Sequence, residues 1–75
     1  MIPANLHELS ELEVAQLLRH LTADEKRIIR LRFGLNGTAP VTLTGASEAT
    51  GLTREVVRQT ELRAMERLGW VTLAK

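Results

Sequence analysis

Apolar residues recur along the chain at the three- and four-residue spacing that places side chains on one face of a helix. In the first segment this pattern is carried by four leucines: Leu9, Leu12, Leu17 and Leu21. Two pairs of residues fit a capping box, in which two side chains bond to amides left free at a helix start: Asn5 with Glu8, and Ser10 with Glu13. The segment therefore predicts a helix over about 10–20, preceded by a short turn.

A second helix is predicted over about 23–33. Thr22 with Glu25 repeats the capping box, and in the stretch ADEKRIIRLRF the charged residues come early and the apolar residues follow. Gly34 stands where helices commonly end in a left-handed residue. Residues 34–41, GLNGTAPV, hold two glycines, an Asn-Gly pair and a proline, which predicts a loop. The Asn-Gly pair is also a hairpin signal, but its flanks lack the alternating pattern of strands.

A third, short helix is predicted over about 43–50, with Thr42 as its cap. Gly45 weakens this helix, since glycine in a helix costs about 0.8–1 kcal/mol relative to alanine. Gly51 then permits a tight turn, and Leu52 is expected to reach the core.

The last helix is predicted over about 54–68, because Thr53 can cap its start and Gly69 can end it. Three apolar residues of the tail are expected to fold back onto the core: Trp70, Val71 and Leu73. Two helices joined by a turn of three or four residues define a helix-turn-helix, and residues 42–68 fit this description. We therefore predict an all-α fold: one small four-helix domain over 1–75, divided into an N-terminal helical segment 1–21, a helix and loop 22–41, a helix-turn-helix 42–69 and a tail 70–75.

The composition narrows the classes of function. The chain has 75 residues, 44% of them hydrophobic, and its two aromatic residues leave an aliphatic core too small for a large cofactor pocket. The absence of cysteine excludes disulfides and thiolate metal sites. His7 and His20 are too far apart for a helical metal pair, and no spacing indicates a nucleophile or a phosphate loop. We predict no enzyme activity, no cofactor, no metal and no small-molecule substrate.

The hydropathy pattern predicts a cytoplasmic protein, since no apolar run approaches a membrane span and the first residues do not resemble a signal peptide. The formal net charge is +1, but it is unevenly placed. Residues 1–18 carry glutamates and no lysine or arginine, whereas 19–32 and 54–75 each carry five basic side chains. Because a strong DNA binder is usually more basic, we expect weak DNA affinity without help.

The predicted last helix has two different faces. One stripe holds Val57, Thr60, Ala64 and Leu68, and the opposite face holds Arg54, Glu55, Arg58, Gln59 and Leu62. Polar residues in the first turns of a recognition helix reach base edges in the major groove. Arginine pairs with guanine, glutamine with adenine, and glutamate with the cytosine amino group. A solvated face with charge pairs gives the same pattern, and the pattern alone leaves both interpretations open.

The string LTADEKRIIRLRFGL, followed by VTL and then GLTREVVRQTELRAMERL, resembles region 4 of the sigma-70 family. The resemblance runs from about Leu21 to Leu68, and RLRFGL and TREVVRQTE are its specific parts. It implies a module that recognises the promoter −35 element on double-stranded DNA while bound to the β-subunit flap of RNA polymerase, in a bacterial or phage-encoded setting. An activator or anti-sigma protein is a further implied partner.

The resemblance also implies roles for individual residues. Base contacts fall on Arg54, Glu55 and Gln59. Contacts with the DNA backbone or an activator fall on Arg58 and Arg63, and phosphate contacts on Arg32 and Thr42. Contacts with the flap fall on Phe33, Leu35 and Leu68, although each also fits a plain core position, which is the preferred assignment.

Several positions depart from the family pattern by losing positive charge or a phosphate contact: Asp24, Thr44, Gly45, Ser47, Val56, Glu66 and Gly69. Binding should therefore be weaker and less sensitive to salt than in a standard member. Two alternatives stay open. The first is an adaptor that acts through protein contacts, which is favoured by the lost charges and by Leu62 on the outward face. The second is a helix-turn-helix repressor, which would need a dimer surface, and the tail is the candidate for that surface. Seventy-five residues have no room for the other domains of a full sigma factor, so we expect an excised domain or a stand-alone protein.

Overall fold

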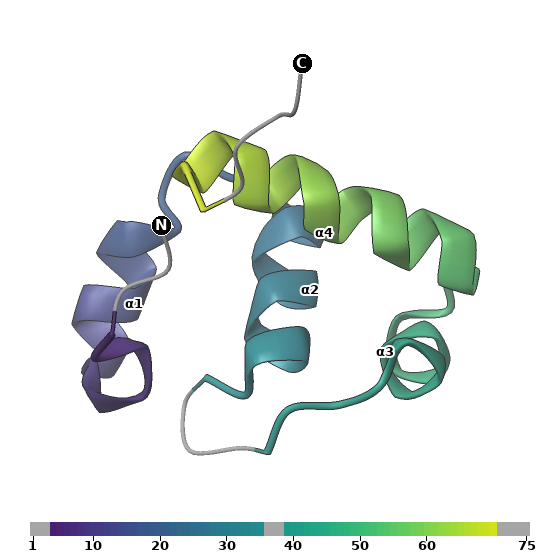
Figure 1. The fold of residues 1–75 in the computed structure, drawn as a ribbon, viewed down its shortest axis with the longest axis horizontal. Coiled ribbons are helices and arrows are strands. Elements are labelled where there is room, and N and C mark those ends of the chain that lie inside the picture. Colours follow the sequence, from purple (N-terminus) through teal and green to yellow (C-terminus); the bar gives the residue numbers. More distant parts are fainter. Residues whose placement is uncertain (1–3, 36–38, 71–75) are drawn as a thin grey trace.

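The computed structural model describes residues 4–35 and 39–70. Within these ranges every regular element is helical, which confirms the all-α prediction (Figure 1). The elements are a 3-10 helix, η1, over Leu6–Glu8, followed by α1 over Glu11–Leu17, α2 over Ala23–Phe33, α3 over Leu43–Thr50 and α4 over Arg54–Leu68. In the same residues no helix has the length and apolar character needed to cross a membrane.

Local capping explains where the last three helices begin and end, and their predicted bounds are confirmed. Thr22 opens α2 in a complete capping box, and the hydroxyls of Thr42 and Thr53 accept backbone N–H groups at the starts of α3 and α4. Each of the three helices is followed by a glycine that caps its C-terminal end. In the turn between α3 and α4, Gly51 has a φ of 77°, a left-handed conformation that favours glycine.

The glycine in the first turn of α3 has a packing reason. A Cβ atom at Gly45 would stand 3.3 Å from the Cβ of Val41 and 3.4 Å from Oγ1 of Thr42. Glycine therefore lets the start of α3 lie close to the preceding segment, at the helix-propensity cost that the sequence predicts.

The first helix differs from the prediction in two ways. The side chain of Asn5 forms no capping hydrogen bond, because its backbone (φ −101°, ψ 26°) is outside the extended region that a capping residue adopts. The second capping box, Ser10 with Glu13, is complete. Helix α1 ends at Leu17 instead of near 20. At Leu18 the backbone leaves the helical conformation (φ −95°, ψ 8°), and the turn that follows places both Leu18 and Leu21 in the core.

The predicted apolar stripe of this first segment is also wrong at one position. Leu12 is 71% exposed, whereas Val14 and Leu18, four residues apart, are fully buried. Leu12 lies two residues before Val14, close to the opposite face of the helix, so both side chains cannot point into the core.

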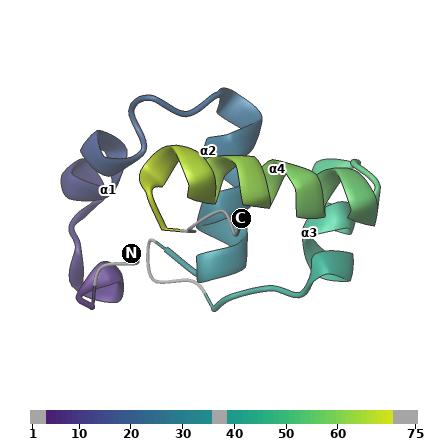
Figure 2. The same cartoon turned by 45° about the horizontal axis from the view of Figure 1, so that its top comes forward.

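Among the described residues the core consists of two clusters, one on each side of α2. Figures 1 and 2 show α4 lying across α2, with α1 and α3 on opposite sides. The first cluster is built around Leu6, Val14, Leu18, Leu21, Ile29, Leu35, Ala64 and Trp70. The second cluster is Ile28, Ala46 and Val57, with Leu52 packed against it as predicted. Because Ile28 and Ile29 are neighbours that point into different clusters, α2 connects the N-terminal part of the fold to the helix-turn-helix.

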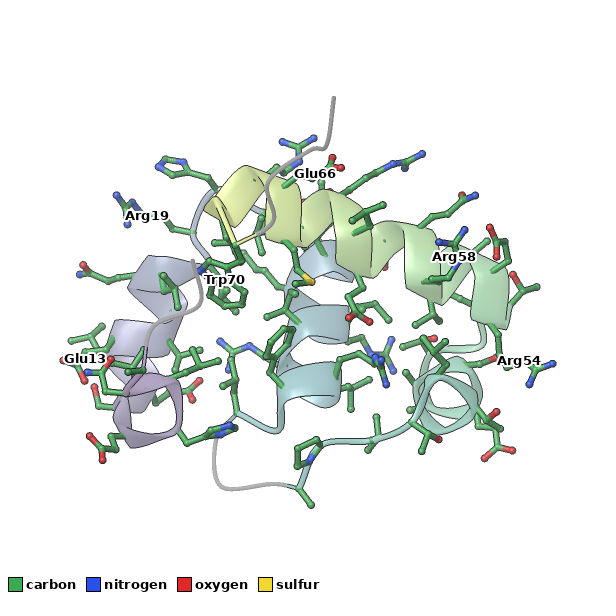
Figure 3. The ribbon with its side chains drawn as sticks, in the orientation of Figure 1. Glu13, Arg19, Arg54, Arg58, Glu66 and Trp70 are labelled. Carbon is green, nitrogen blue, oxygen red and sulfur yellow. The ribbon has the colours of Figure 1, made fainter. Side chains whose placement is uncertain are left out.

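Trp70 closes the first cluster. It is 9% exposed and packs edge-to-face on Phe33, with ring centroids 5.2 Å apart. The predicted return of the tail to the core is confirmed for this residue (Figure 3). Val71 and Leu73, and the Asn36-Gly37 pair, lie outside the described residues.

A nearly buried ion pair connects the start of α2 to the end of α4. Glu25 is 5% exposed, and its Oε1 accepts the backbone N–H of Thr22 at 3.0 Å. Its Oε2 lies 3.2 Å from Nε of Arg67 in the last turn of α4. The sequence indicated the capping role of Glu25 but not this second partner.

Candidate nucleic-acid interface

Side-chain hydrogen bonds fix the turn that sets α4 against α3. The hydroxyl of Ser47 donates to the carbonyl oxygen of Leu52, and the hydroxyl of Thr50 donates to the carbonyl of Ala46 at 2.8 Å. The guanidinium of Arg27 on α2 also donates to the carbonyl of Ala49 at 2.8 Å. These bonds satisfy carbonyl groups near the end of α3 and hold the turn in one geometry. No pattern in the sequence indicated these roles of Ser47 and Arg27.

The first turns of α4 place the three predicted base-contacting residues, together with Arg58, on one exposed surface. We call Arg54, Glu55, Arg58 and Gln59 the reading face; all four are exposed, while Val57 between them is fully buried against α2 and α3. Arg54 and Arg58 lie at the end of α4 that adjoins α3 (Figure 3). Beside them is a hollow of about 500 Å³ that is lined by Leu43, Thr53 and three residues of the reading face.

Three members of the reading face bond to one another. The guanidinium of Arg58 donates two hydrogen bonds to the carboxylate of Glu55, from Nε at 3.1 Å and from Nη2 at 2.7 Å. Nε2 of Gln59 donates to the same carboxylate at 3.0 Å. The hydrogen bond from Arg58 lowers the pKa of Glu55, and the bond from Glu55 in turn raises the pKa of Arg58. The polar face is therefore pre-arranged around one carboxylate.

We expect Glu55 to titrate below the usual range of a glutamate, and Arg58→Ala to raise its pKa towards that range. A group whose pKa is depressed on folding stabilises the native state above its unfolded pKa, and this contribution disappears as the pH falls through the folded pKa. The effect on stability should be small, since the side chain of Glu55 is 60% exposed and its pairing with Arg58 is screened by solvent. Carboxyl chemical shifts followed by NMR from pH 7 to pH 2 measure this pKa; an identical midpoint in both proteins would contradict the bonded arrangement.

Apart from Arg58, the arginines predicted to contact DNA fall into two groups, with and without a protein partner. Within the described part of the chain, Arg54 and Arg63 are exposed and make no side-chain hydrogen bond or ion pair. Arg32 is only 25% exposed: its Nε lies 2.6 Å from Glu61, and its Nη1 donates to the carbonyl of Val41 at 2.8 Å. The structure thus gives Arg32 a bracing position between α2 and α4, and its phosphate contact stays a prediction.

The other predicted phosphate contact, Thr42, is exposed at the start of α3. Its Oγ1 accepts the N–H of Gly45 at 3.0 Å, which leaves the hydroxyl proton available to donate. Thr42 is therefore both a helix cap and a donor on the surface.

The three residues assigned to the polymerase flap all lie in or against the first core cluster. Leu35 is buried at 3% exposure, whereas Phe33 and Leu68 are partly buried and pack against the cluster. Their packing supports the core assignment that the sequence analysis preferred, and a flap contact stays a prediction. A smaller hollow of about 180 Å³ lies along α4 beside Leu62, which is 40% exposed, and is also lined by Met65 and by the charged side chains of Arg32, Arg58 and Glu61.

Comparison with known proteins finds sequence relatives of this chain. The chain is 44% identical over 61 residues to the protein "RNA polymerase sigma factor sigF, chloroplastic" of Arabidopsis thaliana, covering 81% of this chain and 11% of that protein. It is 41% identical over 58 residues to "RNA polymerase sigma-B factor" of Nostoc sp., covering 77% of this chain and 18% of that protein. It is 37% identical over 65 residues to "RNA polymerase sigma factor SigA" of Bacillus sp., covering 87% and 17%.

The chain thus spans less than a fifth of the length of these relatives. No solved structure matches it. Residues 17–68, which include α2, the helix-turn-helix and the reading face, match the model of the family described as "Sigma-70, region 4". The chain belongs to the sigma-70 region 4 family.

Proposed function

We propose that this protein is a transcription-initiation module in which α4 enters the major groove of promoter DNA and reads a −35-type element. The observation that carries the proposal is the reading face, four exposed side chains on the first turns of a helix whose opposite side is buried. Arginine, glutamate and glutamine supply donors and acceptors that match guanine, cytosine and adenine edges. The family relationship supports this use of the face, since the named relatives are RNA polymerase sigma factors.

Contacts around the reading face would fix the register of α4 without reading sequence. Arg63, one helical turn further along the exposed side, is suited to a phosphate or to an acidic group of an activator or anti-sigma protein. The hydroxyl of Thr42 and the free N–H groups at the start of α3 are suited to a phosphate on the other side of the groove.

We further propose that RNA polymerase supplies part of the affinity, through its β flap. The formal net charge is +1, so non-specific attraction to DNA is small and the isolated domain should bind weakly. Phe33 and Leu68 have partly exposed surfaces that could meet an apolar partner, whereas Leu35 would support them from within the core. The module would act in the cytosol of a bacterium or of a phage-infected cell.

Arg54→Ala is expected to weaken binding to a −35 promoter duplex by about 30-fold, or roughly 2 kcal/mol, with little effect on a scrambled duplex. Fluorescence anisotropy at fixed salt, with and without a purified β-flap fragment, measures both affinities. Arg19→Ala is a matched control: Arg19 is exposed but lies at the far end of the molecule from Arg54 (Figure 3), so the same loss of charge should have little effect there.

The flap fragment separates two outcomes. A native chain that prefers the promoter duplex, and more strongly with the flap, supports the proposal. Flap binding together with equal affinity for promoter and scrambled duplexes would indicate an adaptor that works through protein contacts, and would contradict promoter reading.

A further inference from the structure

In the isolated domain the reading face is divided between free and occupied side chains. Among the described residues Arg54 makes no side-chain hydrogen bond or ion pair, whereas Arg58 and Gln59 both donate to Glu55. DNA that approaches the reading face must therefore compete with the Glu55 carboxylate for two of the four side chains of this face, Arg58 and Gln59.

We propose that Glu55 acts as an internal competitor of DNA, holding Arg58 and Gln59 in the free domain and releasing them only to a duplex that offers new partners to all three side chains. This inference rests on the proposed function, since it concerns how the same face selects its DNA.

The geometry of the Arg58–Glu55 pair carries the proposal. Nε and Nη2 of Arg58 engage both oxygens of the carboxylate, at 3.1 Å and 2.7 Å, in a bidentate fork. An arginine makes the same kind of fork with a phosphate or with the O6 and N7 atoms of guanine. The carboxylate therefore occupies the Nε–Nη2 fork of Arg58, and a nucleic acid that uses this fork must compete with Glu55 for it.

Helix geometry keeps this competitor in place. Residues three and four positions apart are neighbours on a helix surface, so Glu55 reaches Arg58 and Gln59 without any distortion of α4. The side chains of Glu55 and Arg58 are 60% and 55% exposed, so the pair is solvated and its strength is modest. A weak, exposed pair exchanges readily, which suits a selector and not a permanent block.

Different DNA sites would replace the lost bonds to different extents. A phosphate group accepts from Arg58 but repels the carboxylate of Glu55, which then loses its donors without replacement. A base-pair sequence that offers an amino donor to Glu55 and acceptors to Arg58 and Gln59 restores the full set of hydrogen bonds. Glu55 should therefore penalise non-specific binding more than binding to the correct site.

The test measures affinities of the native chain, Glu55→Gln and Glu48→Gln for a −35 promoter duplex and for a scrambled duplex at low salt. Glu48 is exposed on α3 and, within the described residues, has no ion pair, so its variant removes one negative charge from the same helix-turn-helix without touching the reading face. We expect Glu55→Gln to raise affinity for the scrambled duplex by up to about fivefold, well beyond the gain from Glu48→Gln, and to reduce the ratio between the two duplexes.

The same measurements in a variant that lacks Arg58 and Gln59 separate competition for these side chains from simple repulsion between Glu55 and phosphate. When Arg58 and Gln59 are both replaced by alanine, Glu55 has nothing to hold, and Glu55→Gln should then gain no more than Glu48→Gln. Equal gains from Glu55→Gln in the native and the double-alanine backgrounds would overturn the proposal, because repulsion of phosphate acts in both.

A readout in the absence of DNA completes the test. The NMR signals of the Arg58 Nε–H and the Gln59 carboxamide should shift in Glu55→Gln and not in Glu48→Gln, and unchanged signals would also overturn the proposal. Failure of the proposed function looks different: the native chain would not prefer the promoter duplex, and Arg54→Ala would leave its binding unchanged.

Discussion

Ile28→Ala is expected to lower the free energy of unfolding by about 3 kcal/mol, from the lost apolar contacts and the cavity left behind. Ile28 is fully buried, and it joins α2 to Ala46 of α3 and Val57 of α4. A domain of this size has on the order of 3–5 kcal/mol of net stability, so the variant should be largely unfolded at 37 °C. Urea unfolding followed by circular dichroism measures the loss.

Ile28→Val is the graded control for this prediction, with an expected loss of about 0.5–1.5 kcal/mol. Ile29→Ala is the positional control, since Ile29 belongs to the other cluster together with Trp70. At a low temperature where both alanine variants are folded, the fluorescence of Trp70 should change in Ile29→Ala and stay close to native in Ile28→Ala. A native midpoint for Ile28→Ala would mean that the second cluster does not hold the helix-turn-helix to α2.

The predicted bounds of α2, α3 and α4 are confirmed, and each depended on local interactions. A cap such as Thr22 or Thr53 bonds to an amide three residues away, and a C-terminal glycine acts on its own backbone, so both signals can be read from a short window of sequence. The error at Leu12 arose because the buried face of a helix is not set by local interactions. Several leucines near helical spacing fit more than one stripe, and packing against the rest of the fold decides which stripe is buried.

The interactions that the sequence did not reveal join residues far apart in the chain. Arg32 with Glu61, and Glu25 with Arg67, each connect α2 to α4, and nothing near either residue marks its partner. The same holds for Arg27, which bonds to a carbonyl on α3. Any charged residue on a helix has many candidate partners, and the arrangement of helices in space decides among them.

For the reading face, the sequence predicted the exposure of the side chains but not the way in which they pair. Its exposure follows from helical periodicity, and the structure confirms that all four of its residues are exposed while Val57 is buried. The sequence left open a base-reading face or a solvated face with charge pairs. The structure shows the charge pair of the second interpretation, Glu55 with Arg58, while Arg54 is unpaired among the described residues and base reading stays a prediction. Side-chain rotamers decide which of these residues pair, and helical periodicity does not specify rotamers.

Glu25→Ala is expected to lower the free energy of unfolding by about 3 kcal/mol, because the carboxylate has two structural roles. Loss of its bond to the N–H of Thr22 removes half of the capping box at the start of α2, worth about 1 kcal/mol. Loss of its ion pair with Arg67 adds about 2 kcal/mol, less than for a fully buried pair because Arg67 is 56% exposed. Urea unfolding against the native chain measures the sum.

Two further variants separate these roles. Glu25→Gln keeps an oxygen for the Thr22 amide but removes the charge, so it should lose less stability than Glu25→Ala. Arg67→Ala should destabilise in turn, since it leaves a carboxylate that is only 5% exposed with the Thr22 amide as its partner. If Glu25→Gln and Arg67→Ala both unfold like the native chain, the ion pair does not hold the end of α4 to α2. If the prediction is correct, the packing of α4 on α2, and with it the direction in which the reading face points, depends on a contact at the opposite end of the helix from that face.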